Sequence, residues 1–151
     1  MTAQVWTRPR STGASLYTPL WLSYLAKAYA ELGQFDGAWR RIGEAMNKIE
    51  TTKERWFEAE ANRIAGEIAL KLPKRDTAKA QSYFERALTV ARQQQAKSGE
   101  LRASMSLARL WRDQGKVQQA RELLEVYGWF TEGFDTRDLK EAKALLEELA
   151  S

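Results

Sequence analysis

The stretch from Ser98 to Tyr127 constrains the fold of this chain more than any other, because it has the pattern of a helical hairpin. Apolar residues recur there at helical spacing in two short segments joined by Gln114-Gly115-Lys116. Gly115 is suited to end the first segment, since glycine enters the left-handed backbone region without the steric cost that other residues meet. The apolar positions are Leu101, Met105, Ala108 and Trp111 in the first segment and Val117, Ala120, Leu124 and Tyr127 in the second. Such a hairpin buries one face between its own helices and keeps a second apolar face, so it needs neighbours of its own kind.

The chain supplies two more hairpins with the same pattern. When the three hairpins are aligned, each has a small residue in its first helix and an alanine in its second helix. The three alanines of the second helices lie 42 and 40 residues apart. These pairs are Ala26 and Ala38, Gly66 and Ala80, and Ala108 and Ala120. We expect them where paired helices cross, because larger side chains would push the helix axes beyond their usual separation of about 8–10 Å.

Local signals divide the chain into segments. Thr18-Pro19 is typical of a helix start, Thr51 and Glu54 have the spacing of a capping box, Pro73 breaks a helix, and Asp76 is a candidate N-cap. We therefore predict a flexible lead-in over 1–13 and a helical repeat domain over 14–151, with hairpins at about 15–50, 52–96 and 98–127 and a capping helix at about 136–150. The last segment has one apolar and one charged side, which suits a helix that seals the end of an array of repeats.

The composition argues against catalysis. The 151 residues include no cysteine and no histidine, which removes disulfides, Ser-His and Cys-His pairs and the usual zinc sites. Carboxylates occur in pairs at Glu58/Glu60, Glu122/Glu125 and Glu147/Glu148, but lysines and arginines surround them on faces that we expect to be solvated, without the apolar pocket that tunes an acid-base pair. We therefore predict a protein that is not an enzyme and has no cofactor and no metal.

The same reasoning predicts a cytoplasmic protein without membrane contact. No apolar run approaches the roughly 20 residues that cross a bilayer. The first residues, MTAQVWTRPRSTG, are too polar for a secretory signal.

Basic residues are the best candidates for a binding site. If the hairpins curl so that their first helices line an inner surface, the inward side chains include a basic set, which we predict to bind a partner: Lys27, Arg63, Arg102, Arg109 and Arg112. Met105 belongs to the same predicted site, as an adaptable apolar contact between the arginines. Ser23, Glu31, Glu60, Glu67, Lys71 and Asp113 would share that surface. Arginine forks suit carboxylates and phosphates. The alternative is a solvated helix face with pairs such as Glu67–Lys71 at i,i+4.

Aromatic residues also suggest a ligand box, but core packing is the better interpretation of Trp56, Trp111, Trp129 and Phe134, which occupy apolar positions or hairpin joins.

The hairpins resemble the tetratricopeptide repeat (TPR), whose signature is W-x2-L-G-x2-Y, then A-x3-F, then P. Leu22, Leu25, Ala26 and Tyr29 carry the first part in hairpin one, and Ser104, Leu107, Ala108 and Trp111 carry it in hairpin three. The resemblance implies an all-α, right-handed superhelix of about three TPR-like hairpins plus a C-terminal capping helix. The period of 40–42 residues exceeds the usual ~34, the closing proline is missing, and the second hairpin has Asn62 and Ala69 at the two large positions. Another helical array is therefore the alternative fold.

Three segments, 54–60, 107–115 and 127–136, resemble the TPR tail of large bacterial signalling proteins. Those proteins carry a nucleotidyl cyclase or DNA-binding domain and then an ATPase ahead of the repeats. The resemblance implies a scaffolding or sensing role in bacterial signalling. This chain has neither the phosphate-binding loop nor a cyclase motif, so it would correspond to the tail alone.

Together these features predict a protein–protein interaction or scaffolding module that presents a concave helical surface to a peptide or partner domain, with an acidic segment as the best match. One alternative is a nucleic-acid-associated regulatory domain, which a net charge of +4 without dense basic clusters disfavours. The other is a homo-oligomer formed through the N-terminal hairpin, on whose edge we expect bare apolar residues at Leu16, Tyr17, Leu20 and Trp21.

Overall fold

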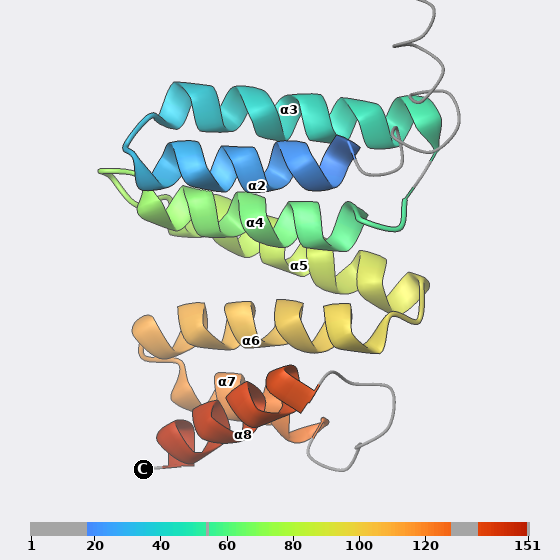
Figure 1. The fold of residues 1–151 in the computed structure, drawn as a ribbon. Helices are drawn as coiled ribbons and strands as arrows, with labels where there is room; N and C mark the ends of the chain where they lie inside the picture. Colours follow the sequence, from blue (N-terminus) through green and yellow to red (C-terminus); the bar gives the residue numbers. More distant parts are fainter. Residues whose placement is uncertain (1–17, 54, 128–135, 151) are drawn as a thin grey trace, which may run out of the picture.

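A computed structural model describes residues 18–53, 55–127 and 136–150, and within these ranges the protein is all-helical. The predicted all-α class is thus confirmed for the described residues. The helices are α2 (Thr18–Glu31), α3 (Phe35–Thr52), α4 (Glu58–Lys71), α5 (Thr77–Gln93), α6 (Lys97–Asp113), α7 (Val117–Glu125) and α8 (Thr136–Ala150). Neighbouring helices pair as α2–α3, α4–α5 and α6–α7, and the pairs stack in chain order, with α8 packed on the last of them (Figure 1).

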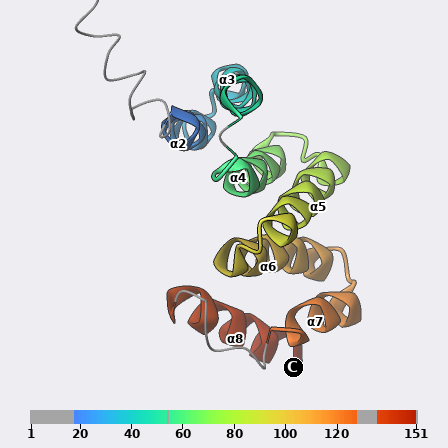
Figure 2. The ribbon, with the colours of Figure 1, turned by 90° about the vertical axis from the view of Figure 1, so that its right-hand side faces the viewer.

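The first helix of each pair lies on the same side of the stack. Figure 2 shows α2, α4, α6 and α8 along one side and α3, α5 and α7 along the other. Contacts run from α2 to α4, from α4 to α6 and from α6 to α8. One side of the molecule is therefore built from the three first helices together with α8.

Small residues let the paired helices approach closely. The structure buries all six of the small residues at the expected crossing points. Gly66 shows why size matters, because a Cβ added there would overlap the ring of Phe84 on α5. Phe84 fills the space that the missing side chain leaves.

Glycine also ends two first helices. Gly33 follows α2 with φ +78° and Gly115 follows α6 with φ +81°, both in the left-handed region. Asp76 caps α5, since its Oδ1 accepts a hydrogen bond of 3.0 Å from the Lys79 backbone nitrogen.

The junction between α3 and α4 differs from the prediction. Thr51 does not cap a new helix: it lies in the last turn of α3, where its hydroxyl donates to the Asn47 carbonyl at 2.7 Å. A threonine hydroxyl has this i−4 carbonyl available inside a helix, so its cap-like spacing was misleading. The helix α3 ends at Thr52, the next residue Lys53 is in the left-handed region with φ 61°, and α4 starts only at Glu58. Glu54, the other half of the expected box, lies outside the described residues.

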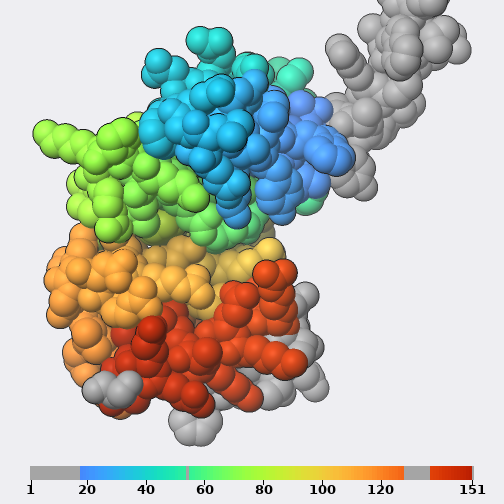
Figure 3. Space-filling model, turned by 60° about the vertical axis from the view of Figure 1, so that its left-hand side comes forward, coloured from blue at the N-terminus to red at the C-terminus, as the bar shows by residue number. Residues whose placement is uncertain are grey.

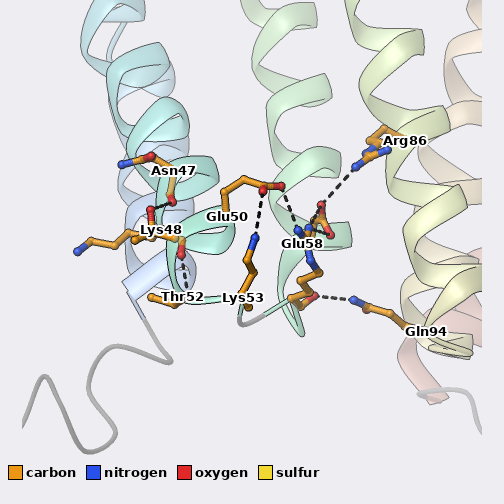
Figure 4. Close-up of polar contacts among 10 residues, drawn as sticks. Asn47, Lys48, Glu50, Thr52, Lys53, Glu58, Arg86 and Gln94 are labelled. Carbon is orange, nitrogen blue, oxygen red and sulfur yellow. Dashed lines mark hydrogen bonds and ion pairs between the residues drawn. The ribbon is translucent and has the colours of Figure 1, made fainter.

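Polar contacts hold this junction to the next hairpin (Figure 4). Lys53 and Glu50 pair at 4.0 Å, and Glu58 pairs with Arg86 of α5 at 3.5 Å. The Gln94 side chain donates a hydrogen bond of 2.6 Å to the Arg55 carbonyl. The α3–α4 connection is thus fixed by both α3 and α5.

Three large apolar clusters follow one another along the stack, and a small fourth cluster joins α4 to α5 through Ala59, Val90 and Ala91. The first joins α2 and α3 to α4, the second joins α4 and α5 to α6, and the third joins α6 and α7 to α8. Each hairpin therefore packs its apolar face on the first helix of the unit that follows. The end of the third hairpin is covered by α8, through Ala142, Leu145 and Leu149.

The tryptophans divide between the core and the surface. Trp111 is half-buried between two of the clusters, whereas Trp56 is 47% exposed, so its expected place in the core was wrong. Trp56 lies in the α3–α4 connection, ahead of the helix that would have buried it. Trp129 and Phe134 lie outside the described residues, as do the lead-in 1–13 and the edge residues Leu16 and Tyr17. None of the described helices is both long enough and apolar enough to span a membrane.

Candidate functional site

A hollow of about 390 Å³ lies on the side built from first helices, and α2, α4, α6 and α8 all contribute to its walls. Figure 3 shows α8, in red, lying against the yellow and orange surface of α6 at the lower end of the stack. The charged residues of the hollow are the cations Lys27, Arg63, Arg102, Arg109 and Arg137 and the carboxylates Glu60, Asp138 and Glu141. Five cations face three carboxylates, so the hollow carries a net charge of +2.

Five of the six residues singled out from the sequence line this one hollow. They are Lys27, Arg63, Arg102, Met105 and Arg109. The sixth, Arg112, lies one turn further along α6 and lines an adjoining hollow of about 350 Å³ together with Arg109, Glu141 and Glu148. The helical stacking therefore brings the residues of all three hairpins onto one surface.

Arg63 is the most firmly held of these cations. Its Nε donates to Glu60 at 2.9 Å and a terminal nitrogen donates to Glu67 at 2.6 Å. Burial lowers the pKa of Arg63, but the hydrogen bonds and charges of Glu60 and Glu67 outweigh it, and the pKa lies above its ordinary value. The alternative of a solvated helix face paired Glu67 with Lys71, whereas in the structure Glu67 pairs with Arg63. Arg63 thus anchors two carboxylates and is the least available of the cations.

The arginines of α6 face carboxylates of α8. Arg102 lies 3.5 Å from Asp138, Arg109 lies 4.0 Å from Glu141, and Arg112 pairs with Glu148. Sequence reasoning missed these pairs, because it assigned the charged side of the last helix to solvent. The sequence did carry a usable signal. The three arginines are seven and three residues apart on α6, and the three carboxylates are three and seven residues apart on α8, so each set keeps to one face of its helix.

These ion pairs are partly exposed and leave the arginines accessible. The side chains of Arg102 and Arg109 keep 42% and 43% of their surface. Exposed pairs of this kind contribute little to stability, about 0–1 kcal/mol each. A competing carboxylate can therefore replace Glu141 at small cost, whereas Asp138 is buried, and its pair with Arg102 is not of this exposed kind.

Lys27 and Met105 complete the set in different ways. Lys27 is half-buried on α2, and within the described ranges no carboxylate lies within 4.0 Å of its amine. Met105 was expected to offer an adaptable apolar contact between the arginines, but it is only 1% exposed and belongs to the core of the third hairpin. Lys27 is therefore available to a ligand, and Met105 serves mainly as packing.

A third hollow, of about 420 Å³, adjoins the first and is bounded by aromatic rings. Tyr24 and Phe57 have ring centroids 6.2 Å apart, and Trp56 and Phe57 have theirs 5.4 Å apart. The two hollows share Tyr24, Glu60, Ser98 and Arg102. Basic and aromatic surfaces are thus continuous, a juxtaposition that sequence reasoning missed because it placed Trp56 in the core.

A polar network lies behind this surface, between α5, α6 and the end of α7. The Ser104 hydroxyl donates to the Tyr127 hydroxyl at 3.1 Å, which donates to Glu100 at 2.8 Å. Arg92 pairs with the same carboxylate at 3.2 Å. Burial raises the pKa of Tyr127, and its hydrogen bond to Glu100 acts in the same direction. The network ties the hairpins together and does not reach the hollow.

The arrangement is suited to binding an anionic group beside an apolar one. Within 18–53, 55–127 and 136–150 no group of three acidic side chains is placed to hold a metal ion. Comparisons with protein-family models, with curated proteins and with solved structures found no match to this chain.

Proposed function

We propose that this protein is a non-catalytic interaction module that captures an acidic segment of a partner protein on the side formed by α2, α4, α6 and α8. In this proposal the hairpins are TPR-like, they form a right-handed superhelix, and the first helices line its concave surface. A role as a scaffold in bacterial signalling follows from the resemblance to the tails of such proteins.

One observation carries the proposal: four helices contribute to a single hollow with a net charge of +2. Lys27 supplies a cation without a carboxylate within 4.0 Å in the described part of the chain, and Arg102 and Arg109 keep exposed surface. The adjoining rings of Tyr24, Trp56 and Phe57 offer an apolar contact. A partner segment with glutamates or aspartates next to one bulky apolar side chain matches both the basic hollow and the adjoining aromatic rings.

The proposal can be tested by selecting, from a random peptide library, the peptides that bind to the full chain. We expect the bound peptides to be enriched in carboxylates next to an apolar residue, with Kd values in the micromolar range, roughly −8 kcal/mol. A selection that enriches basic or uncharged peptides would contradict the proposal.

Charge reversal then locates the binding surface. Lys27→Glu should weaken an enriched acidic peptide at least tenfold, about 1.4 kcal/mol, because it replaces an available cation with a repelling carboxylate. Arg40→Glu is the matched control, since Arg40 is exposed on α3, outside the hollow. Equal affinities of the two variants would place the site elsewhere.

Arg109→Glu with Arg112→Glu is a less direct test. Each new carboxylate would face Glu141 or Glu148 of α8 and repel it. Loss of binding in that double variant would combine loss of the cations with loosening of α8.

A further inference from the structure

The three hollows adjoin one another and form one groove. The aromatic hollow, of about 420 Å³, shares Ser98 and Arg102 with the basic hollow, of about 390 Å³. The basic hollow in turn shares Arg109 and Glu141 with the hollow of about 350 Å³, which we call the distal hollow. The groove therefore passes from the aromatic hollow through the basic hollow to the distal hollow.

The groove runs along the helices. On each of α2, α4, α6 and α8, residues nearer the N-terminus line an earlier hollow than residues nearer the C-terminus. The pairs that show this are Tyr24 and Lys27 on α2, Ala59 and Arg63 on α4, Lys97 and Arg112 on α6, and Arg137 and Glu148 on α8. Figure 1 shows that all four helices run in the same direction, from right to left in the view. The aromatic hollow therefore lies at the N-terminal end of the groove and the distal hollow at its C-terminal end.

The aromatic end of the groove suits an aromatic side chain. The rings of Tyr24 and Phe57, and those of Trp56 and Phe57, are tilted by 58° with centroids 6.2 and 5.4 Å apart. Tyr24 and Trp56 are about half exposed, so their rings remain open to a further ring, and tilted contacts are among those that aromatic pairs prefer. Ala59 and Gly99, which also line this hollow, are small and leave room for such a ring.

Cations follow the rings along the groove. The basic hollow carries a net charge of +2, and Lys27 lines it one turn after Tyr24 on α2. Arg109 lines both the basic and the distal hollow, and its side chain keeps 43% of its surface. In the distal hollow two arginines face two glutamates, so its charges balance. The groove therefore attracts carboxylates to the stretch between the rings and Arg109.

The length of the groove matches a short extended chain. Ser98 and Arg112 are 14 residues apart on α6, which is about 21 Å at 1.5 Å per residue. An extended chain spans that length with about six residues, at roughly 3.3 Å each. A short extended segment therefore contacts all three hollows.

We propose that the partner's acidic segment lies extended along this groove, with one aromatic side chain in the aromatic hollow and its carboxylates all on one side of that residue. The inference rests on the proposed function, because it concerns how the same acidic segment is bound. The one-sided order follows from the position of the aromatic hollow at the end of the groove. Carboxylates on the other side of the aromatic residue would lie past that end and gain no contact with Lys27 or Arg109.

Three heptapeptides of identical composition, with capped ends, test this order on the full chain. Each contains one tryptophan, three glutamates and three serines, and the tryptophan is first, last or central with glutamates on both sides. The first two peptides cover both directions in which a chain can lie in the groove. We expect the tighter of these two to bind about fivefold more tightly than the central one, because a central tryptophan keeps some of the glutamates outside the groove. Fluorescence titration measures the affinities.

The possible failures are distinguishable. If the peptide with the central tryptophan binds as tightly as the better of the other two, or more tightly, the order along the groove is wrong while the proposed function stands. If none of the three acidic peptides binds, the proposed function is wrong as well.

Two variants locate the ends of the bound segment. Trp56→Ala should weaken the tighter peptide about fivefold and leave unchanged a peptide with serine in place of the tryptophan. Arg109→Gln should weaken the tighter peptide, but not one whose glutamate farthest from the tryptophan is replaced by glutamine.

Arg121→Gln on α7 is the matched control for Arg109→Gln. Arg121 is similarly exposed and also pairs with a glutamate, but it lies outside the groove, so this variant should bind both peptides as the unchanged chain does. If Trp56→Ala and Arg109→Gln each weakened both peptides of their pair equally, the segment would not lie in the proposed order.

Discussion

Single small residues set the distance between the paired helices, and Gly66 is the clearest case. A glycine inside a helix normally costs about 0.5–1 kcal/mol relative to alanine. At Gly66 we expect alanine to be less stable than glycine, because an added methyl group would meet the Phe84 ring, which is itself buried. The steric conflict outweighs the helix propensity.

Gly66→Ala should therefore destabilise the fold by about 1–3 kcal/mol through overpacking. Gly43→Ala is the matched control, because Gly43 lies inside α3 with nothing within 4 Å of the added atom. It should stabilise the chain by up to about 1 kcal/mol. Urea unfolding of the two variants measures both changes in the free energy of unfolding. If Gly66→Ala stabilised the chain as Gly43→Ala does, the α4–α5 crossing would have room for the added methyl group.

The Tyr127 hydroxyl is a second residue-scale feature. Tyr127→Phe leaves the buried Ser104 hydroxyl without its acceptor, which should cost about 1–3 kcal/mol. Adding Ser104→Ala should recover part of that loss, because no unpaired hydroxyl remains. A double-mutant cycle measures the coupling, and strictly additive effects would mean that the two groups do not interact.

At the scale of elements, α8 is held more by its apolar side than by its ion pairs. Leu145 is buried among residues of α6 and α7, whereas the side chain of Glu148 keeps 59% of its surface while it pairs with Arg112. Burial of a leucine side chain outweighs an exposed ion pair.

Leu145→Ala should accordingly destabilise the chain by about 2–5 kcal/mol. Glu148→Ala should change stability by less than about 1 kcal/mol. Thermal unfolding compares the two, and an equal loss for both would contradict the view that apolar packing holds α8.

Helix positions and the small residues at the crossings within each hairpin could be predicted from the sequence, whereas the ion pairs between α6 and α8 could not. Periodic apolar residues and the signals at Asp76 and Gly115 place the helices and several of their ends. Thr51 was misread, because a threonine hydroxyl satisfies a backbone group equally well at a helix start and within a helix. The pairing of Arg102 with Asp138 joins residues 36 positions apart, and no local pattern specifies which two helix faces will meet.

For the whole molecule, stacking of like units explains where the basic residues gather. Each first helix packs on the one before it, so residues at equivalent positions fall on one side of the stack (Figure 2). The predicted basic set became one surface for this reason. The aromatic hollow beside it could not be foreseen, because it depends on how the irregular segment before α4 meets α2.

The central claim is that this surface captures an acidic segment, and chemical-shift mapping by NMR tests it most directly. Titrating the isotope-labelled full chain with an acidic peptide that carries glutamates next to a leucine should shift signals of Lys27, Arg63, Arg102 and Arg109. A peptide with lysines in place of the glutamates should leave those signals unchanged. Shifts confined to α3, α5 and α7, or equal shifts with both peptides, would contradict the claim.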